Sequence, residues 1–221
     1  RPAIFKVPAV AVAPTPETPL KVPAIRIAPP EVFKTTPPPD VFATQSLIDK
    51  TKRSTAGWTF TGEAKDFQFQ EGALFLQHLK GWNFAERQLP GSEFVLRANI
   101  QTPTGGDECE VHVGIAEKQY IACGIRLPAN AKRVSAYVER RDIKTNAVLE
   151  SLAKIDDLSV DDAHNLRIQL WDNQATCFLN DTFMVSAEVD SAAMPKRLRL
   201  GVRNGIAQYS LLEVSPRAAA K

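Results

Sequence analysis

The stretch HNLRIQLWDNQATCFLNDTFMV, residues 164–185, contains two β-strands and the start of a third, separated by short polar turns. The first strand alternates apolar and polar side chains at Leu166, Arg167, Ile168, Gln169 and Leu170. This period of two is typical of a half-buried strand, and it recurs at residues 94–100 and 111–115. Beyond residue 56 no segment shows the stripe of an amphipathic helix, so the body of the chain is predicted to be all-β.

Short polar dipeptides between the strands predict tight hairpins, because Asn, Asp and Gly tolerate positive φ. The predicted hairpins are Asp172-Asn173, which pairs Cys177 with Ile168, Asn180-Asp181, which pairs Phe178 with Phe183, and Asn204-Gly205, which pairs Val202 with Ala207. Many short strands joined by such turns favour a two-sheet antiparallel sandwich.

A change of composition near residue 43 divides the chain. Eleven of the sixteen prolines, and none of the eleven glycines, lie in residues 1–42. Because proline fixes φ and pushes the preceding residue to extended geometry, this segment is predicted to be an extended Pro-rich arm. The predicted parts are the arm at 1–42, a connector at 43–56 with room for one short helix around residues 45–52, the sandwich at 57–215 and a C-terminal tail at 216–221.

The arm repeats its own sequence. KVPAVAVAP at 6–14 returns as KVPAIRIAP at 21–29, and PPEVF at 29–33 returns as PPDVF at 38–42. A disordered spacer does not need regularly placed apolar residues, so the arm is expected to dock onto other protein subunits. The expected docking residues are Ile4, Phe5, Val10, Val12, Ile25, Ile27, Val32, Phe33, Val41 and Phe42. The alternative is an arm that wraps its own domain, or a repeat without function.

Composition excludes several classes of protein. The chain has 221 residues and a net charge of +2, which is too balanced to indicate a nucleic-acid partner. No apolar run is long enough to cross a bilayer, so no membrane span is expected. The motifs of nucleotide-binding proteins, zinc proteases and serine hydrolases are absent, so no cofactor and no catalytic residue is predicted. The chain begins at Arg1; a removed signal peptide or an anchor before it would fit, which favours export to the periplasm or cell envelope.

The three cysteines, Cys109, Cys123 and Cys177, lack the spacing of a metal site and are expected to be small buried apolar residues. A hairpin loop at Glu117-Lys118 would place Cys123 opposite His112, about three rungs from Cys109. That separation argues against a disulfide between Cys109 and Cys123.

The closing segments of the chain resemble a known family. Residues 164–185, followed by RLRLGVRNGIAQYSLLEV at 197–214, resemble the last strands of concanavalin A-like lectin and glucanase sandwiches. Upstream, EGALFLQ at 71–77 and RQLPGSEFVLRANIQTPTGG at 87–106 resemble the keto-disaccharide or glycoside hydrolase-like branch of that superfamily. The resemblance covers residues 57–215 and implies a jelly-roll fold. It does not fix the function, since this sandwich serves sugar binding, glycoside cleavage and scaffolding alike.

Glycoside-cleaving members of that superfamily carry alternate carboxylates on one strand, as in ExDxxE. The nearest match is ECEVH, in which Glu108, Glu110 and His112 share one face of a strand. Two carboxylates about 7 Å apart on such a face could serve as general acid and base. The motif's Asp and its last Glu are absent, so the alternative is a solvated strand face with no catalytic role. We add Trp171 to these residues as a candidate ligand face, because it is the tryptophan expected to be exposed.

Two further clusters have simpler explanations. Asp156, Asp157, Asp161 and Asp162 lie in a loop-like segment and offer oxygen ligands for calcium, but turn chemistry explains them without a metal. Arg97, Arg167, Arg197, Arg199 and Arg203 fall on the polar phase of their strands, and Arg140 and Arg141 follow another strand. They would form a basic strip if they shared a sheet face, or a solvated face if they did not.

The favoured function is a non-catalytic accessory subunit of a larger assembly, such as a membrane-associated photosynthetic or respiratory complex, held by its arm. The first alternative is a domain that binds carbohydrate or processes glycosides. The second alternative is a shell or surface protein.

Overall fold

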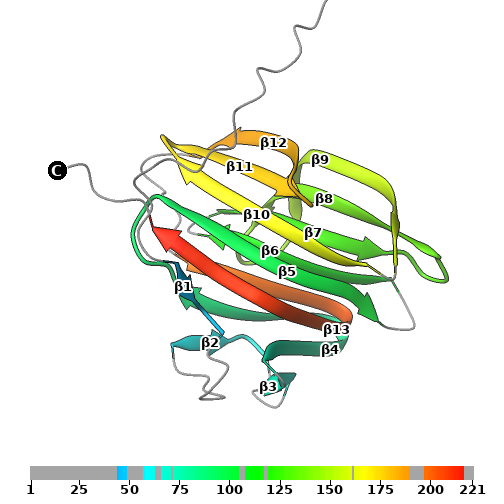
Figure 1. The fold of residues 1–221 in the computed structure, drawn as a ribbon. Coiled ribbons are helices and arrows are strands. Elements are labelled where there is room, and N and C mark those ends of the chain that lie inside the picture. Colours follow the sequence, from blue (N-terminus) through cyan, green and yellow to red (C-terminus); the bar gives the residue numbers. More distant parts are fainter. Residues whose placement is uncertain are drawn as a thin grey trace, which may run out of the picture. The chain divides into compact units, whose positions relative to one another are not determined.

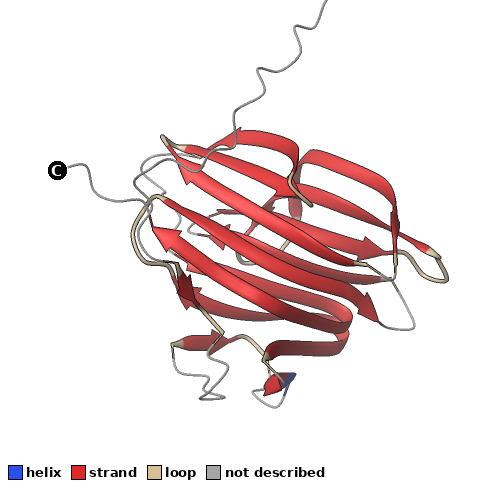
Figure 2. Cartoon of the chain, viewed as in Figure 1, coloured by secondary structure: helices blue, strands red, loops and turns tan. Residues whose placement is uncertain are grey.

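The computed structural model describes residues 44–48, 57–62, 66–70, 72–104, 108–116, 119–160, 162–189 and 197–216. All predicted docking residues of the arm lie outside these ranges. The described residues form thirteen strands (Figures 1 and 2). These are β1 (Gln45–Ser46), β2 (Trp58–Phe60), β3 (Phe67–Gln70), β4 (Ala73–Gln88), β5 (Phe94–Thr104), β6 (Cys109–Ala116), β7 (Gln119–Leu127), β8 (Arg133–Asp142), β9 (Val148–Ser159), β10 (Ala163–Trp171), β11 (Gln174–Leu179), β12 (Thr182–Glu188) and β13 (Arg197–Pro216). Within the described ranges, no helix is both long enough and apolar enough to cross a membrane.

The strands make two antiparallel layers, which we call sheet A and sheet B. Sheet A contains β6, β7, β8 and β9 as successive neighbours, with the first half of β13 paired to β6. Sheet B contains β5, β10, β11 and β12, with the second half of β13 paired to β5. The final strand is therefore shared by both layers, and the two sets of strands lie over one another (Figure 1). The predicted all-β sandwich is confirmed.

The long strands β4 and β13 run side by side from one sheet into the other. Residues 82–88 of β4 pair with residues 197–203 of β13 in sheet A, and residues 74–78 pair with 205–209 further along. The register shifts between Arg203 and Gly205, where Asn204 has a φ of 53°. The hairpin predicted at Asn204-Gly205 is therefore wrong. The positive φ belongs to a β-bulge, the device by which a strand bends without ending.

The two hairpins predicted in the stretch 164–185 are confirmed. Ile168 pairs with Cys177, and Phe178 pairs with Phe183. The prediction at 117–118 is one residue out of register, because Cys123 lies opposite Val113 rather than His112. The observed register places the apolar side chains of both strands on the core face, which a slip of one residue would prevent.

The core lies between the sheets and begins earlier in the chain than predicted. Leu47 and Ile48, in the predicted connector, belong to the hydrophobic core. The residues just before them form β1, which pairs with β13, so residues 45–48 are not helical; residues 49–56 lie outside the described ranges. At the other end Pro216, assigned to the tail by the sequence, still pairs with Phe94.

Candidate functional site

The most polar buried part of the molecule is the outer face of sheet A. On β6, Val111 and Val113 point into the core, so Glu110 and His112 point to the opposite side of the sheet, as the alternation predicts. Both are nonetheless inaccessible to solvent, with relative exposures of 2% for Glu110 and 0% for His112. The expectation of a solvated strand face is therefore wrong, because side chains from four other strands cover these residues.

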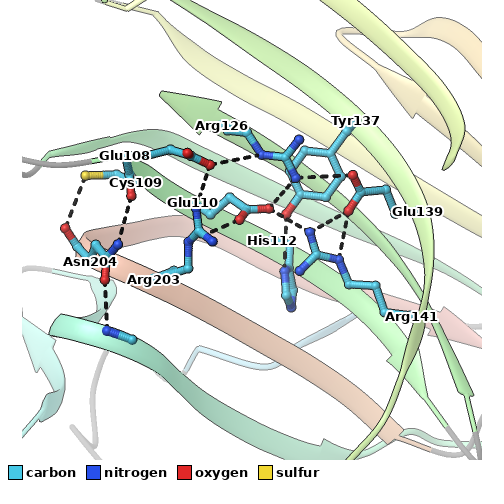
Figure 3. Close-up of polar contacts among 11 residues, drawn as sticks. Glu108, Cys109, Glu110, His112, Arg126, Tyr137, Glu139, Arg141, Arg203 and Asn204 are labelled. Carbon is cyan, nitrogen blue, oxygen red and sulfur yellow. Dashed lines mark hydrogen bonds and ion pairs between the residues drawn. The ribbon is translucent and has the colours of Figure 1, made fainter. Parts of the chain in front are cut away.

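Two carboxylates and two guanidinium groups form the centre of this face (Figure 3). Glu110 Oε1 accepts from Nη2 of Arg126 at 2.7 Å and from Nη2 of Arg141 at 2.6 Å. Glu139 accepts from Arg141 Nε at 2.8 Å and from Arg126 Nη2 at 3.2 Å. Each arginine thus binds both carboxylates, which compensates the cost of burying four charges.

The pKa of Glu110 is set by two opposing effects. Burial alone would raise it, but the positive charges of Arg141, Arg126 and Arg203 together hold the pKa of Glu110 below its ordinary value. A glycosidase needs one carboxyl group whose pKa is raised, so that it can donate a proton near neutral pH. The environment of Glu110 has the opposite effect and keeps the group ionised.

His112 is held neutral at the centre of the same face. Its Nδ1 lies 3.3 Å from the hydroxyl of Tyr137, and its Nε2 has no hydrogen-bond partner among the described residues. Burial, followed by the charges of nearby arginines such as Arg141, lowers the pKa of His112 well below 6.5. The ring rests against the backbone of β13, where a Cβ on Gly201 would clash with it. A side chain at this position would displace the imidazole.

Aromatic rings alternate with guanidinium groups over the rest of the face. Trp82 and Phe84 on β4 are stacked, with centroids 5.5 Å apart and an interplanar angle of 6°. Arg141 lies over Trp82 at 5.1 Å, and Arg199 lies over Phe84 at 4.6 Å. Arg126 lies over Tyr137 at 4.6 Å. Each ring presents its negative face to a cation, which is favourable in a site shielded from water.

A second ion-pair cluster fixes the turn between β8 and β9 against this face. Glu86 accepts from Arg199 Nε at 2.6 Å and from Arg197 Nη1 at 3.1 Å. Arg199 also donates from Nη1 to the carbonyl of Ile143 at 2.9 Å. Because Ile143 belongs to the turn, the arginine links β4, β13 and the turn.

One solvent-accessible end of this layer of side chains carries both a ring and charged groups, and we call it the rim. The rim consists of Glu108, Arg126, Arg203 and the half-buried Trp82. Glu108 is 47% exposed at its side chain and accepts from Nη2 of Arg203 at 2.5 Å. A flat aromatic ring beside charged donors and acceptors offers both apolar contact and hydrogen bonds to a ligand.

The structure separates some residues that the sequence grouped. Trp171 ends β10 in sheet B and therefore shares no face with Glu110 and His112. Arg97 and Arg167 pair with each other, also in sheet B. The arginines of β13 do share a face with one another, but Glu86, Glu108 and Glu110 are interleaved among them, so the basic strip is a mixed-charge layer.

Half of the predicted acidic loop is part of a strand. Asp156 and Asp157 lie in β9 and form ion pairs with Lys154 and Arg133 respectively. Asp161 lies outside the described ranges. Within those ranges no group of three or more His, Cys, Asp or Glu side chains is placed to hold a metal ion.

Sequence reasoning missed most of this layer. Trp82, Tyr137 and Glu139 were not predicted as site residues. Part of the layer could have been found from the sequence, because Glu110 and Arg126 are paired on neighbouring strands. The predicted hairpin, shifted by one residue, did not pair them. Glu139 pairs with Ala122 on β7, so its approach to Glu110 depends on the order of three strands.

No protein-family model and no curated protein matches the chain. Several solved structures match in fold. The carbohydrate-binding module CBM66 of Bacillus subtilis aligns with a TM-score of 0.56 at 15% identity, over 72% of this chain and 95% of the module. The CBM2 module of the evolved Dit of Lactobacillus casei BL23 phage J-1 aligns with a TM-score of 0.59 at 10% identity, over 82% and 97% of the two chains.

An enzyme of the same architecture also aligns. A prokaryotic β-1,3-1,4-glucanase (lichenase) from a mouse hindgut metagenome has a TM-score of 0.55 at 9% identity, over 79% of this chain and 98% of the enzyme. Identities this low carry information on the fold and not on the activity. The chain has the antiparallel jelly-roll sandwich fold that these two carbohydrate-binding modules and this glucanase share.

Proposed function

We propose that the sandwich is a carbohydrate-binding domain that does not cleave its ligand. The fold is one that carbohydrate-binding modules and a glucanase share with this chain. The observation that carries the proposal is the rim of sheet A, where Trp82 lies next to Arg203, whose guanidinium is 5.8 Å from the ring centroid. A sugar presents an apolar C–H face and a rim of hydroxyl groups, and both kinds of contact are available there.

Binding without cleavage is supported by the state of the carboxylates. Glu110 and Glu139 both accept hydrogen bonds from Arg126 and Arg141. A carboxylate held in this way is neither a free nucleophile nor a proton donor. Glu108, the residue before β6, is exposed but is ion-paired with Arg203, so Glu108 and Glu110 are not a pair of free carboxylates.

A glycan array followed by titration calorimetry of the best ligand tests the proposal. Trp82→Ala and Glu108→Gln should each weaken binding about tenfold or more, equivalent to about 1.4 kcal/mol. Trp171→Ala is the matched control, because it removes the same side chain from sheet B and should leave binding unchanged. Glu108 is exposed, so its variant is expected to fold even if Trp82→Ala does not.

Two results would contradict the proposal. The wild-type protein binding no glycan on the array is one, and loss of binding in Trp171→Ala with retention in Glu108→Gln is the other. Release of new reducing ends from the bound glycan, abolished by Glu110→Gln, would show that the protein is an enzyme instead.

A second candidate function rests on the arm. The repeats at 6–14 and 21–29 favour an accessory subunit that docks onto a larger assembly of the cell envelope through residues 1–42. The two functions are compatible, because the arm and the rim are different segments of the chain. Affinity purification at native salt tests the second: the full chain should retain protein partners that a chain lacking residues 1–42 loses. Equal retention by both would contradict it.

A further inference from the structure

Two of the three cysteines meet in the core, one from each sheet. Cys123 lies on β7 in sheet A, and Cys177 lies on β11 in sheet B. Both are fully buried, and their Sγ atoms are 2.6 Å apart. This distance is within about 0.6 Å of the length of a disulfide bond, roughly 2.05 Å. It is shorter than the ordinary contact between two nonbonded sulfur atoms.

Strand register makes this pair specific. On β7, Cys123 and Ile125 point into the core, and on β11 Cys177 does the same, so the two side chains approach from opposite layers. Cys109 is four residues along β6 from Val113, the partner of Cys123, which separates the two cysteines by about 13 Å along the strand. The thiol of Cys109 donates instead to the carbonyl of Asn204 at 3.2 Å.

We propose that Cys123 and Cys177 form a disulfide that joins sheet A to sheet B when the chain folds in an oxidising compartment. The oxidant is a small disulfide of the oxidised glutathione class. The thiolate of one cysteine attacks it, forms a mixed disulfide and releases one reduced thiol. The thiolate of the second cysteine then attacks the protein sulfur of the mixed disulfide and releases the other thiol. Two protein thiols lose two protons and two electrons, and the oxidant gains them.

The bond forms while the sheets are still closing. Burial raises the pKa of Cys123, and both sulfur atoms are inaccessible once the sandwich is complete. Folding brings the two sulfur atoms together, so reaction with the oxidant must occur before the core excludes it. The bridge spans 54 residues of sequence, a long loop whose closure stabilises the fold by restricting the unfolded chain. The proposal does not depend on the carbohydrate-binding function.

Refolding of the full chain tests the proposal. The denatured, reduced protein is refolded in reduced and oxidised glutathione, then alkylated and analysed by intact mass and by peptide mapping without reduction. We expect a product about 2 Da lighter than the reduced chain, a linked pair of peptides containing Cys123 and Cys177, and one alkylated thiol at Cys109. The melting temperature should exceed that of the protein refolded in dithiothreitol by roughly 10 °C.

Single variants fix the identity of the pair. Cys109→Ala should still form the bridge, whereas Cys123→Ala and Cys177→Ala should retain two alkylatable thiols each. Three alkylatable thiols in the wild-type protein refolded in reduced and oxidised glutathione would overturn the proposal. A linkage that includes Cys109 would also overturn it. Because Cys109→Ala keeps both bridging residues, the proposal stays testable even if the other two variants fold poorly.

Discussion

His112 shows how a single side chain depends on its surroundings. A neutral imidazole can be buried among Arg126, Arg141 and Arg199 because it adds no further charge to theirs. Protonation would place a fourth positive charge beside three guanidinium groups that already form ion pairs with Glu86, Glu110 and Glu139. The residue is therefore suited to fill space between rings, with one hydrogen bond to Tyr137, and unsuited to act as a proton donor.

The buried imidazole predicts a pH-dependent stability. Its pKa is well below 6.5 in the folded protein, so below pH 6.5 the unfolded chain binds a proton that the folded protein does not. The free energy of unfolding is therefore not reduced by His112 above about pH 6.5. Below that pH it falls on acidification, by up to about 1.4 kcal/mol per pH unit for this group. Urea unfolding between pH 7.5 and 5.5 should show this slope in the wild-type protein and a smaller one in His112→Gln.

A comparison variant separates the contribution of His112 from that of His164, whose pKa burial also lowers. His164→Gln should keep the share of the slope that belongs to His112. If the wild-type and His112→Gln curves ran parallel across this pH range, the assignment of the neutral state to His112 would be wrong.

Single residues were predicted with mixed success. The alternation in ECEVH correctly places Glu110 and His112 on one side of β6, because the period of two is a local property of a strand. Their burial was not predictable, since Tyr137, Arg141 and Trp82 reach them from positions 25 or more residues away in the sequence. The alternation along a strand predicts to which side of the sheet a side chain points. It does not predict which other side chains cover it.

Two polar dipeptides that both predict a hairpin turn form different structures. Asp172 and Asn173, with φ values of 49° and 61°, close the hairpin between β10 and β11 as predicted. Asn204 also has positive φ, yet β13 continues through it. The side chain of Asn204 accepts from the N–H of Gly81 at 2.8 Å, so the bulge is tied to β4. A dipeptide that allows positive φ permits a turn or a bulge, and the neighbouring strand decides between them.

Gly205 in this bulge predicts a sensitive position in β13. A Cβ at residue 205 would lie 2.6 Å from the carbonyl oxygen of Thr104 and 3.1 Å from Sγ of Cys109. Gly205→Ala should therefore lower the free energy of unfolding by about 1–3 kcal/mol, the usual cost of overpacking a core. Ser210→Ala is the control, because Ser210 is exposed on the same strand and should change stability by less than about 0.5 kcal/mol. Equal urea midpoints for the two variants would show that the bulge has room for a side chain.

At the scale of the whole molecule, the fold was more predictable than its outer layer. Short strands with apolar residues on alternate positions dictate two sheets that bury one face each against the other. The sequence gives no comparable signal that sheet A would bury part of its second face beneath Arg, Glu and aromatic side chains. The arginines and glutamates among them are polar residues, which a reading of polar and apolar positions assigns to solvent. Their burial arises from the order of β4, β13, β6, β7 and β8, which brings together residues 82 to 203.

The position of β13 also governs when the molecule can fold during its synthesis. β5 and β6 are not neighbours in either sheet; each pairs with a different half of the strand that ends at Pro216. A nascent chain that has emerged from the ribosome only as far as residue 196 lacks the central strand of both layers. A chain that grows from its N-terminus therefore cannot complete one sheet before the other. Both sheets are completed only when the 20-residue strand β13 has been synthesised. Until then the edges of β5 and β6 stay open to chaperones.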